Sequence, residues 1–195
     1  PEASPLSTGL DRGSPPPSIF NDVIGPVMRG PSSSHCAAAL RIGRLARDLV
    51  GGELDSVLVE FHPRGSLATT HTSQGSDMGL FGGLLGWEAT DSRLVDSAQA
   101  LQSAGIRAEI RITEFQAVHP NTYRLTLKSR STQHQLVALS TGGGIIRVVE
   151  IDGIPLSLDG DRFSTLVFLG KSEPGKFLKR GRSGEFEPGE AGGEG

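Results

Sequence analysis

Cysteine, long apolar runs and clustered positive charge are all scarce in this sequence. It has a single cysteine, Cys36, among 195 residues. One thiol can form no intrachain disulfide and cannot alone hold a zinc ion or an iron–sulfur cluster. No apolar run approaches the roughly 18 residues of a membrane span. The net charge is −3 and the basic residues are scattered, which argues against a nucleic-acid partner. We therefore expect a cytoplasmic protein, with an organelle as the open alternative because the sequence begins with Pro1 rather than Met.

Large apolar side chains are also scarce at both ends of the chain. Residues 1–17, PEASPLSTGLDRGSPPP, and residues 179–195, KRGRSGEFEPGEAGGEG, are rich in Pro, Gly, Ser or Glu. Such segments bury too little apolar surface to offset the entropy of ordering them. We predict that both are disordered and that one main domain, 18–160, lies between them.

Hydrophobic periodicity within the middle of the chain predicts helices followed by strands. Helical spacing predicts a short helix within 18–30 that ends at Gly25-Pro26, and further helices over 31–52, 77–87 and 92–105. The glycines of 77–87 indicate close packing. Strands are predicted within 56–68, 107–117, 121–129, 134–158 and 165–170. This order predicts an α/β (α+β) fold class in which helices cover a mostly antiparallel sheet.

The stretch GPSSSHC, residues 30–36, places three serines and His35 at the start of the second predicted helix. A helix N-terminus carries unpaired N–H groups and partial positive charge, so it can bind a carboxylate or a phosphate. A single serine would suffice as an N-cap. Simple capping and an anion or substrate site therefore both stay open.

Three further stretches of polar residues or glycines lie after, between or within predicted strands. RGSLATTHTSQGSD, residues 64–77, contains His71 and ends on Asp77, which could be part of a site or a helix cap. HPNT, residues 119–122, has good turn chemistry. STGGGII, 140–146, permits close backbone approach, but it lacks the lysine and the strand–loop–helix context of a P-loop.

These motifs together resemble a known family. IGPVMRGPSSSHCAAALRIGR, GSLATTHTSQGSD, GGLLGW, HPNT and STGGGII occur in an order and spacing similar to the β chain (β domain) of iron–sulfur-dependent L-serine dehydratase, an L-serine ammonia-lyase. The resemblance covers about residues 18–170. It implies a fold like the allosteric substrate-binding domain of phosphoglycerate dehydrogenase.

The resemblance also implies a partner and a reaction. In that family an α chain or domain carries a 4Fe-4S cluster, and the β part contributes histidines as L-serine is converted to pyruvate and ammonia. This chain would then need the α part for activity, hold no metal itself, and form a homo- or hetero-oligomer without nucleic acid or membrane. The alternatives are a non-catalytic sensor of small amino or hydroxy acids, and a lyase for threonine or cysteine.

Matching the family motifs implies His35 and His71 as catalytic residues. The matched substrate-binding positions are Ser32, Ser33, Ser34, Ser66, Gln74, Asp77, His119 and Asn121. Gln74 stands where the family usually has the histidine that takes the α-proton, and a neutral amide is no base. His71 could serve instead, His35 or a partner residue could take the role, or the chain could have another substrate or a regulatory function.

Two other positions depart from the family pattern. Cys36 stands where threonine is common, and we interpret it as a buried small residue in preference to a redox-sensitive thiol. Residues 161–178 resemble the first strand and turn of a regulatory ACT domain, but no helix and further strands follow. We therefore predict a truncated ACT-like segment without ACT-type regulation.

Overall fold

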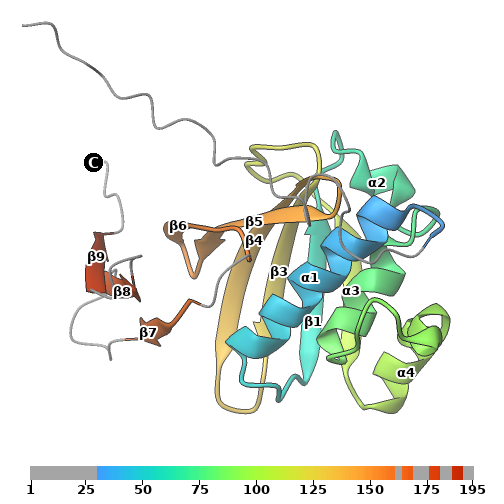
Figure 1. Ribbon diagram of the computed structural model, residues 1–195, viewed down its shortest axis with the longest axis horizontal. Helices are drawn as coiled ribbons and strands as arrows, with labels where there is room; N and C mark the ends of the chain where they lie inside the picture. The colour runs from blue at the N-terminus through green and yellow to red at the C-terminus, as the bar shows by residue number, and fades with distance from the viewer. Residues whose placement is uncertain (1–29, 161–163, 169–175, 181–185, 191–195) are drawn as a thin grey trace, which may run out of the picture.

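The computed structural model describes residues 30–160, 164–168, 176–180 and 186–190 (Figure 1). The helices, in chain order, are α1 (Ser33–Leu49), α2 (Leu67–Thr70), α3 (Ser76–Leu84), the 3₁₀ helix η2 (Ser92–Asp96) and α4 (Ser97–Ser103). The strands are β1 (Ser56–Phe61), β2 (Arg107–Ile112), β3 (Thr122–Lys128), β4 (Gln133–Gly142), β5 (Ile145–Ile151), β6 (Ile154–Leu158), β7 (Leu166–Phe168), β8 (Lys176–Arg180) and β9 (Phe186–Glu190).

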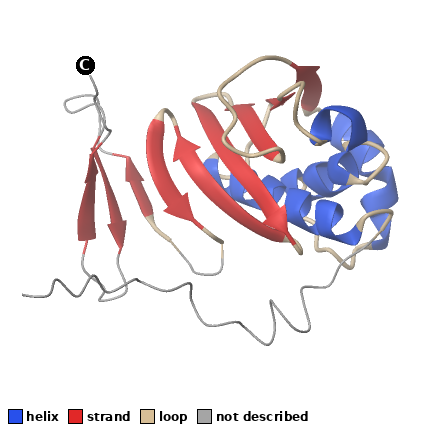
Figure 2. Cartoon of the chain, turned by 90° about the horizontal axis from the view of Figure 1, so that it is seen from above, coloured by secondary structure: helices blue, strands red, loops and turns tan. Residues whose placement is uncertain are grey.

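A six-stranded sheet forms the centre of the fold, in the order β2-β1-β3-β4-β5-β6. Strands β1 and β2 are parallel, and the other neighbouring pairs are antiparallel. The helices cover one face of this sheet (Figure 2). The predicted α+β class with a mostly antiparallel sheet is therefore confirmed, while the likeness to the phosphoglycerate dehydrogenase domain stays a prediction.

The core lies between this sheet and helices α1 and α3. In β1 every second residue is buried, namely Val57, Val59 and Phe61, because side chains alternate between the two faces of a strand. Alanines fill the buried side of α1, and Cys36 is only 2% exposed there, as its interpretation as a small buried residue requires. Small side chains let α1 lie close to the sheet and to α3.

Glycines bring α1 and α3 into direct backbone contact. A Cβ atom added to Gly43 would collide with the carbonyl oxygen of Leu80, and one added to Gly83 with that of Leu40. Gly79 meets the backbone of Cys36 in the same way. The close packing predicted from the glycine-rich sequence of 77–87 is thus present.

Several predicted boundaries differ from the observed ones. The strand predicted within 56–68 ends at Phe61, since the turn around Pro63 offers no further ladder hydrogen bonds, and the short helix α2 follows. The strand within 107–117 ends at Ile112, and the helix over 92–105 is divided into η2 and α4. The short helix predicted within 18–30, ending at Gly25-Pro26, lies outside the described residues. No helix in the described part of the chain has the length and apolar character needed to cross a bilayer.

A second sheet of three strands, β7-β8-β9, contains residues of the predicted ACT-like segment and tail. β7 pairs with β8 and β8 with β9, both antiparallel. Strand β9 lies within residues 179–195, the tail that composition predicts to be disordered, and that assignment stays a prediction.

Candidate functional site

The three serines and His35 lie at the N-terminus of α1. Ser32 is the N-cap residue in extended conformation, but its side chain makes no capping hydrogen bond. Its Oγ atom lies instead 2.8 Å from Nδ1 of His35. Ser32, Ser33, Ser34 and His35 are all half-buried. The hydroxyl of Ser32 thus orients an imidazole ring at a helix N-terminus that remains accessible.

His71 and Asp77 form a tight imidazole–carboxylate pair. His71 Nδ1 lies 2.8 Å from Oδ1 and 2.9 Å from Oδ2 of Asp77. The hydroxyl of Thr72 donates to Oδ2 of the same carboxylate at 2.7 Å. Asp77 is in the first turn of α3, where the helix dipole favours a negative charge. The Asp77 carboxylate is thus held by two side chains at the start of α3 and orients the ring of His71.

The ring of His71 also contacts an aromatic side chain. Its centroid lies 5.3 Å from that of Phe61, at the end of β1. The side chain of His71 is 21% exposed, so solvent or a ligand can reach it. With Nδ1 held by Asp77, Nε2 is the ring atom through which His71 can exchange a proton.

Gln74 joins the turn of His71 to the start of α1. Its main-chain carbonyl accepts a hydrogen bond from the N–H of Ser32 at 3.2 Å. Gly75 has a φ of 78°, and a Cβ there would approach Cδ of Pro31 to 2.9 Å. The side-chain oxygen Oε1 of Gln74 is buried without a hydrogen-bond partner. Gln74 therefore contributes its main chain to this junction, and its side-chain oxygen is an unsatisfied acceptor inside the fold.

The third predicted group lies beside α2. The hydroxyl of Ser66 donates to Oδ1 of Asn121, and Ser66 N–H donates to the carbonyl of Pro120 at 3.1 Å. His119 Nδ1 accepts from the N–H of Asn121 at 3.1 Å. These residues therefore form one hydrogen-bonded corner. Because α2 connects Ser66 to His71, this corner positions the turn of the imidazole–carboxylate pair.

Two buried hydroxyls behind this turn were not predicted as site residues. Tyr123 and Ser76 are 0% and 1% exposed, and neither hydroxyl has a geometric hydrogen-bond partner. Burial raises the pKa of Tyr123, the nearby Ser76 hydroxyl lowers it, and the Asp77 carboxylate raises it further. The alternation of apolar residues in 121–129 marks Tyr123 as inward-facing, but only the fold places it beside Ser76 and Asp77.

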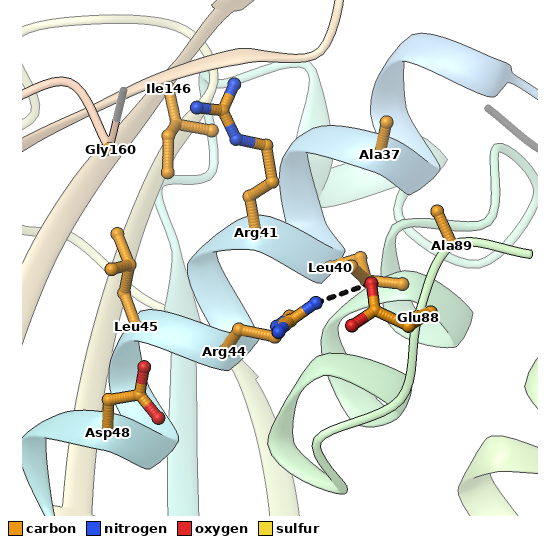
Figure 3. Close-up of a pocket in the computed structure, with 10 residues that line it drawn as sticks. All are labelled: Ala37, Leu40, Arg41, Arg44, Leu45, Asp48, Glu88, Ala89, Ile146 and Gly160. Carbon is orange, nitrogen blue, oxygen red and sulfur yellow. Dashed lines mark ion pairs between the residues drawn. The ribbon is translucent and has the colours of Figure 1, made fainter. Parts of the chain in front are cut away.

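A separate pocket of about 370 Å³ runs along α1 and contains none of the predicted site residues (Figure 3). Arg44 makes an ion pair of 2.6 Å with Glu88 across it. Arg41 donates to the carbonyl of Gly144 at 3.0 Å. Both guanidinium groups are thus engaged by the chain itself, and we assign no ligand to this pocket.

The residues of this chain do not fit the ligand set of an iron–sulfur cluster. A cluster needs several thiolates, and the chain has one cysteine, Cys36. Its side chain is buried in the first turns of α1. In the part of the chain that the structure describes, no group of three or more His, Cys, Asp or Glu residues could hold a metal ion.

The geometry defines a class of protein: an α+β domain that presents oriented histidines, a carboxylate and hydroxyls at the end of a helix-covered sheet. No protein-family model matches the chain. Two curated relatives do. One is described as "Probable L-serine dehydratase, beta chain" from Bacillus subtilis (strain 168); it is 42% identical over 150 residues, which cover 77% of this chain and 67% of the relative.

The other relative, from Peptoniphilus asaccharolyticus, is described as "L-serine dehydratase, beta chain" and is 34% identical over 148 residues. That match covers 75% of this chain and 65% of the relative. The chain thus spans about two thirds of the length of these relatives. It belongs to the family of L-serine dehydratase beta chains, and the resemblance read from the sequence motifs is confirmed.

Proposed function

We propose that this chain is the β component of an iron–sulfur L-serine ammonia-lyase, which converts L-serine to pyruvate and ammonia together with an α chain or domain. The observation that carries the proposal is the His71–Asp77 pair at 2.8 Å beside the Ser32–His35 pair. The names of both relatives support the reaction and the need for a partner. A 4Fe-4S cluster in the α part would supply the metal centre, because the donor set of this chain does not fit one.

His71 is the general base in this proposal. Its Nδ1 proton is donated to Asp77, which leaves the lone pair of Nε2 free to take the α-proton of the substrate. Gln74, one turn away, cannot do so because its amide is neutral and non-basic. Gln74 is instead a substrate-binding residue in this proposal, acting through hydrogen bonds of its amide. In this proposal His71 takes over the role of general base because Gln74 stands where the family usually has a histidine.

The start of α1 binds the substrate carboxylate. Ser33 and Ser34 occupy the first turn, where N–H groups have no acceptor within the helix. His35, held by Ser32 at 2.8 Å, orients or protonates the leaving hydroxyl. The corner of Ser66, His119 and Asn121 supports the turn of His71. The site is completed only when the α part covers it.

The test is anaerobic co-expression of this chain with a cluster-bearing α part, followed by a pyruvate assay on L-serine. His71→Ala should lower kcat by about 100-fold or more, the size of a general-base contribution. His134→Ala is the matched control, since His134 on β4 also pairs with an aspartate, Asp152 of the β5–β6 turn, at 2.7 Å. It should leave kcat unchanged.

Two outcomes would contradict the proposal. If only His35→Ala abolishes activity, His71 is not the base. If a cluster-loaded complex forms but makes no keto acid from serine, threonine or cysteine, the lyase function falls. A role in sensing a small amino or hydroxy acid would then be the remaining function for this site.

A further inference from the structure

The outer edge of β2 is open among the described residues. β2 is the terminal strand of the six-stranded sheet and pairs only with β1 there. The N–H of Arg107 donates to the carbonyl of Asp55, and that of Thr113 to the carbonyl of Phe61, each at 3.0 Å. The N–H and C=O groups of the odd-numbered residues of β2 therefore point toward β1. Even-numbered residues turn their N–H and C=O groups outward, a template for another strand.

Side chains of β2 alternate between an apolar and a charged row. The apolar row, Ala108, Ile110 and Ile112, pairs with buried residues of β1 and so faces the helices. The charged row on the opposite face is Arg107, Glu109 and Arg111. Within it, Arg111 Nε donates to Oε1 of Glu109 at 2.6 Å, and both side chains are more than half exposed.

We propose that β2 pairs antiparallel with β2 of a second copy of this chain, centred on Ile110. A two-fold axis through this point makes each contact occur twice. Ile110 meets Ile110 of the second copy, and Ala108 meets the second copy's Ile112. These are the residues whose main-chain groups point outward, so every pair forms hydrogen bonds. The two six-stranded sheets become one continuous sheet.

The charged row selects this register. When Ile110 is central, Glu109 of each copy lies opposite Arg111 of the other. A shift that centres the pairing on residue 109 would place two glutamates opposite each other. A shift to residue 111 would place two arginines together. Because like charges directly opposite are unfavourable and opposite charges favourable, the pairing centred on Ile110 is preferred over its neighbours.

The apolar row supports the same pairing. Ile112 is a large apolar side chain that is 46% exposed. In the dimer it lies beside Ala108 of the second copy. Ala108 lines a groove of about 490 Å³ together with Phe81 and Leu101. Covering Ile112 against this groove removes apolar surface from water on both sides of the two-fold axis.

The decisive experiment mixes two charge-reversed variants of the full chain. The wild type should sediment as a dimer. Glu109→Arg and Arg111→Glu each place like charges opposite one another twice, so the dissociation constant should rise roughly tenfold or more. In a dimer of one Glu109→Arg copy and one Arg111→Glu copy, residues 109 and 111 that lie opposite each other again carry opposite charges. Native mass spectrometry should then show a mixed dimer with one copy of each variant.

A proline variant tests the main-chain hydrogen bonds. In Ile112→Pro the lost N–H is one that points outward, so the ladder to β1 stays intact. Dimers should disappear while the fluorescence-detected unfolding midpoint changes little. Arg147→Glu, an exposed position on β5, carries the same charge change as Arg111→Glu and should leave the dimer intact.

The proposal is overturned by any of three results. The wild type could stay monomeric throughout the micromolar range. Dimers could persist in both single variants, which would place the interface elsewhere. The mixture could remain monomeric, which would show that the charged row does not face its copy.

Discussion

Nδ1 of His71 lies within hydrogen-bond distance of both carboxylate oxygens of Asp77, at 2.8 and 2.9 Å. The main chain supports this contact, because the carbonyl of His71 accepts the N–H of Ser76 at 2.9 Å. Residues 71–76 thus form a closed turn that orients the imidazole ring of His71. This turn places an oriented imidazole in the same loop as Gln74.

Asp77→Asn should lower kcat of the assembled enzyme by roughly tenfold or more with little change in KM. The amide keeps the shape of the carboxylate but no longer stabilises a protonated ring or fixes its tautomer. Steady-state pyruvate formation by the complex measures both constants. Asp152→Asn, the same change in the other aspartate paired with a histidine, is the control. An equal loss in both variants would show a general effect on folding.

The position of the base can be tested by moving it. His71→Ala should be almost inactive, and the double variant His71→Ala with Gln74→His should recover part of kcat. The peptide of Gln74 is held by Ser32 N–H at 3.2 Å, so an imidazole there would start from a fixed backbone. Gln74→His alone should change kcat less than His71→Ala does. No recovery in the double variant would mean that position 74 cannot reach the substrate.

The layer architecture could be predicted because the sequence carries its signals locally. Alternation in 56–61 and the alanine-rich run of α1 indicate a half-buried strand and a closely packed helix, and the structure has both. The parallel pairing of β1 with β2 could not be predicted, since it depends on contacts between segments about 50 residues apart. Helix α2 was missed because four residues carry too little periodicity.

The contacts between residues of the candidate site were harder to predict than the residues themselves. His71 and Asp77 both stood out in one polar loop, but their contact depends on the left-handed φ of Gly75 at the start of α3. The serines suggested an N-cap, whereas Ser32 turns its hydroxyl to His35. For Tyr123, the sequence pattern predicts only that the side chain faces the core, not which residues it contacts. Such contacts arise from tertiary structure, which a residue pattern alone does not determine.

Gly83→Ala should destabilise the fold by about 1–3 kcal/mol, the usual cost of overpacking. The new methyl would collide with the carbonyl of Leu40 and approach Gly43 Cα to 3.0 Å. These are backbone atoms, which cannot move aside. The gain of about 0.5–1 kcal/mol in helix propensity is smaller. Urea unfolding followed by Trp87 fluorescence measures the change.

Gly30→Ala is the control for that substitution, because a Cβ at Gly30 meets nothing within 4 Å. Its unfolding midpoint should match the wild type. If Gly83→Ala were equally stable, α1 and α3 could separate without cost, and the close backbone contact would not be needed for the fold.

The hydroxyl of Tyr123 should make stability fall at alkaline pH. Burial raises the pKa of Tyr123, so the folded state keeps its proton while the unfolded state ionises near pH 10. The stabilising difference is complete below about pH 10 and is lost as the pH rises toward the raised pKa, by about 1.4 kcal/mol per pH unit at most.

Tyr123→Phe should remove this part of the pH dependence and leave stability at neutral pH unchanged or slightly higher, because its hydroxyl is buried without a partner. Urea unfolding of both proteins at about pH 8 and about pH 11 measures the difference. The chain has a single tyrosine, so tyrosinate absorbance follows this residue alone. Ionisation of the folded wild type near pH 10 would show that water reaches the hydroxyl, and that the space between Ser76 and Asp77 is open to solvent.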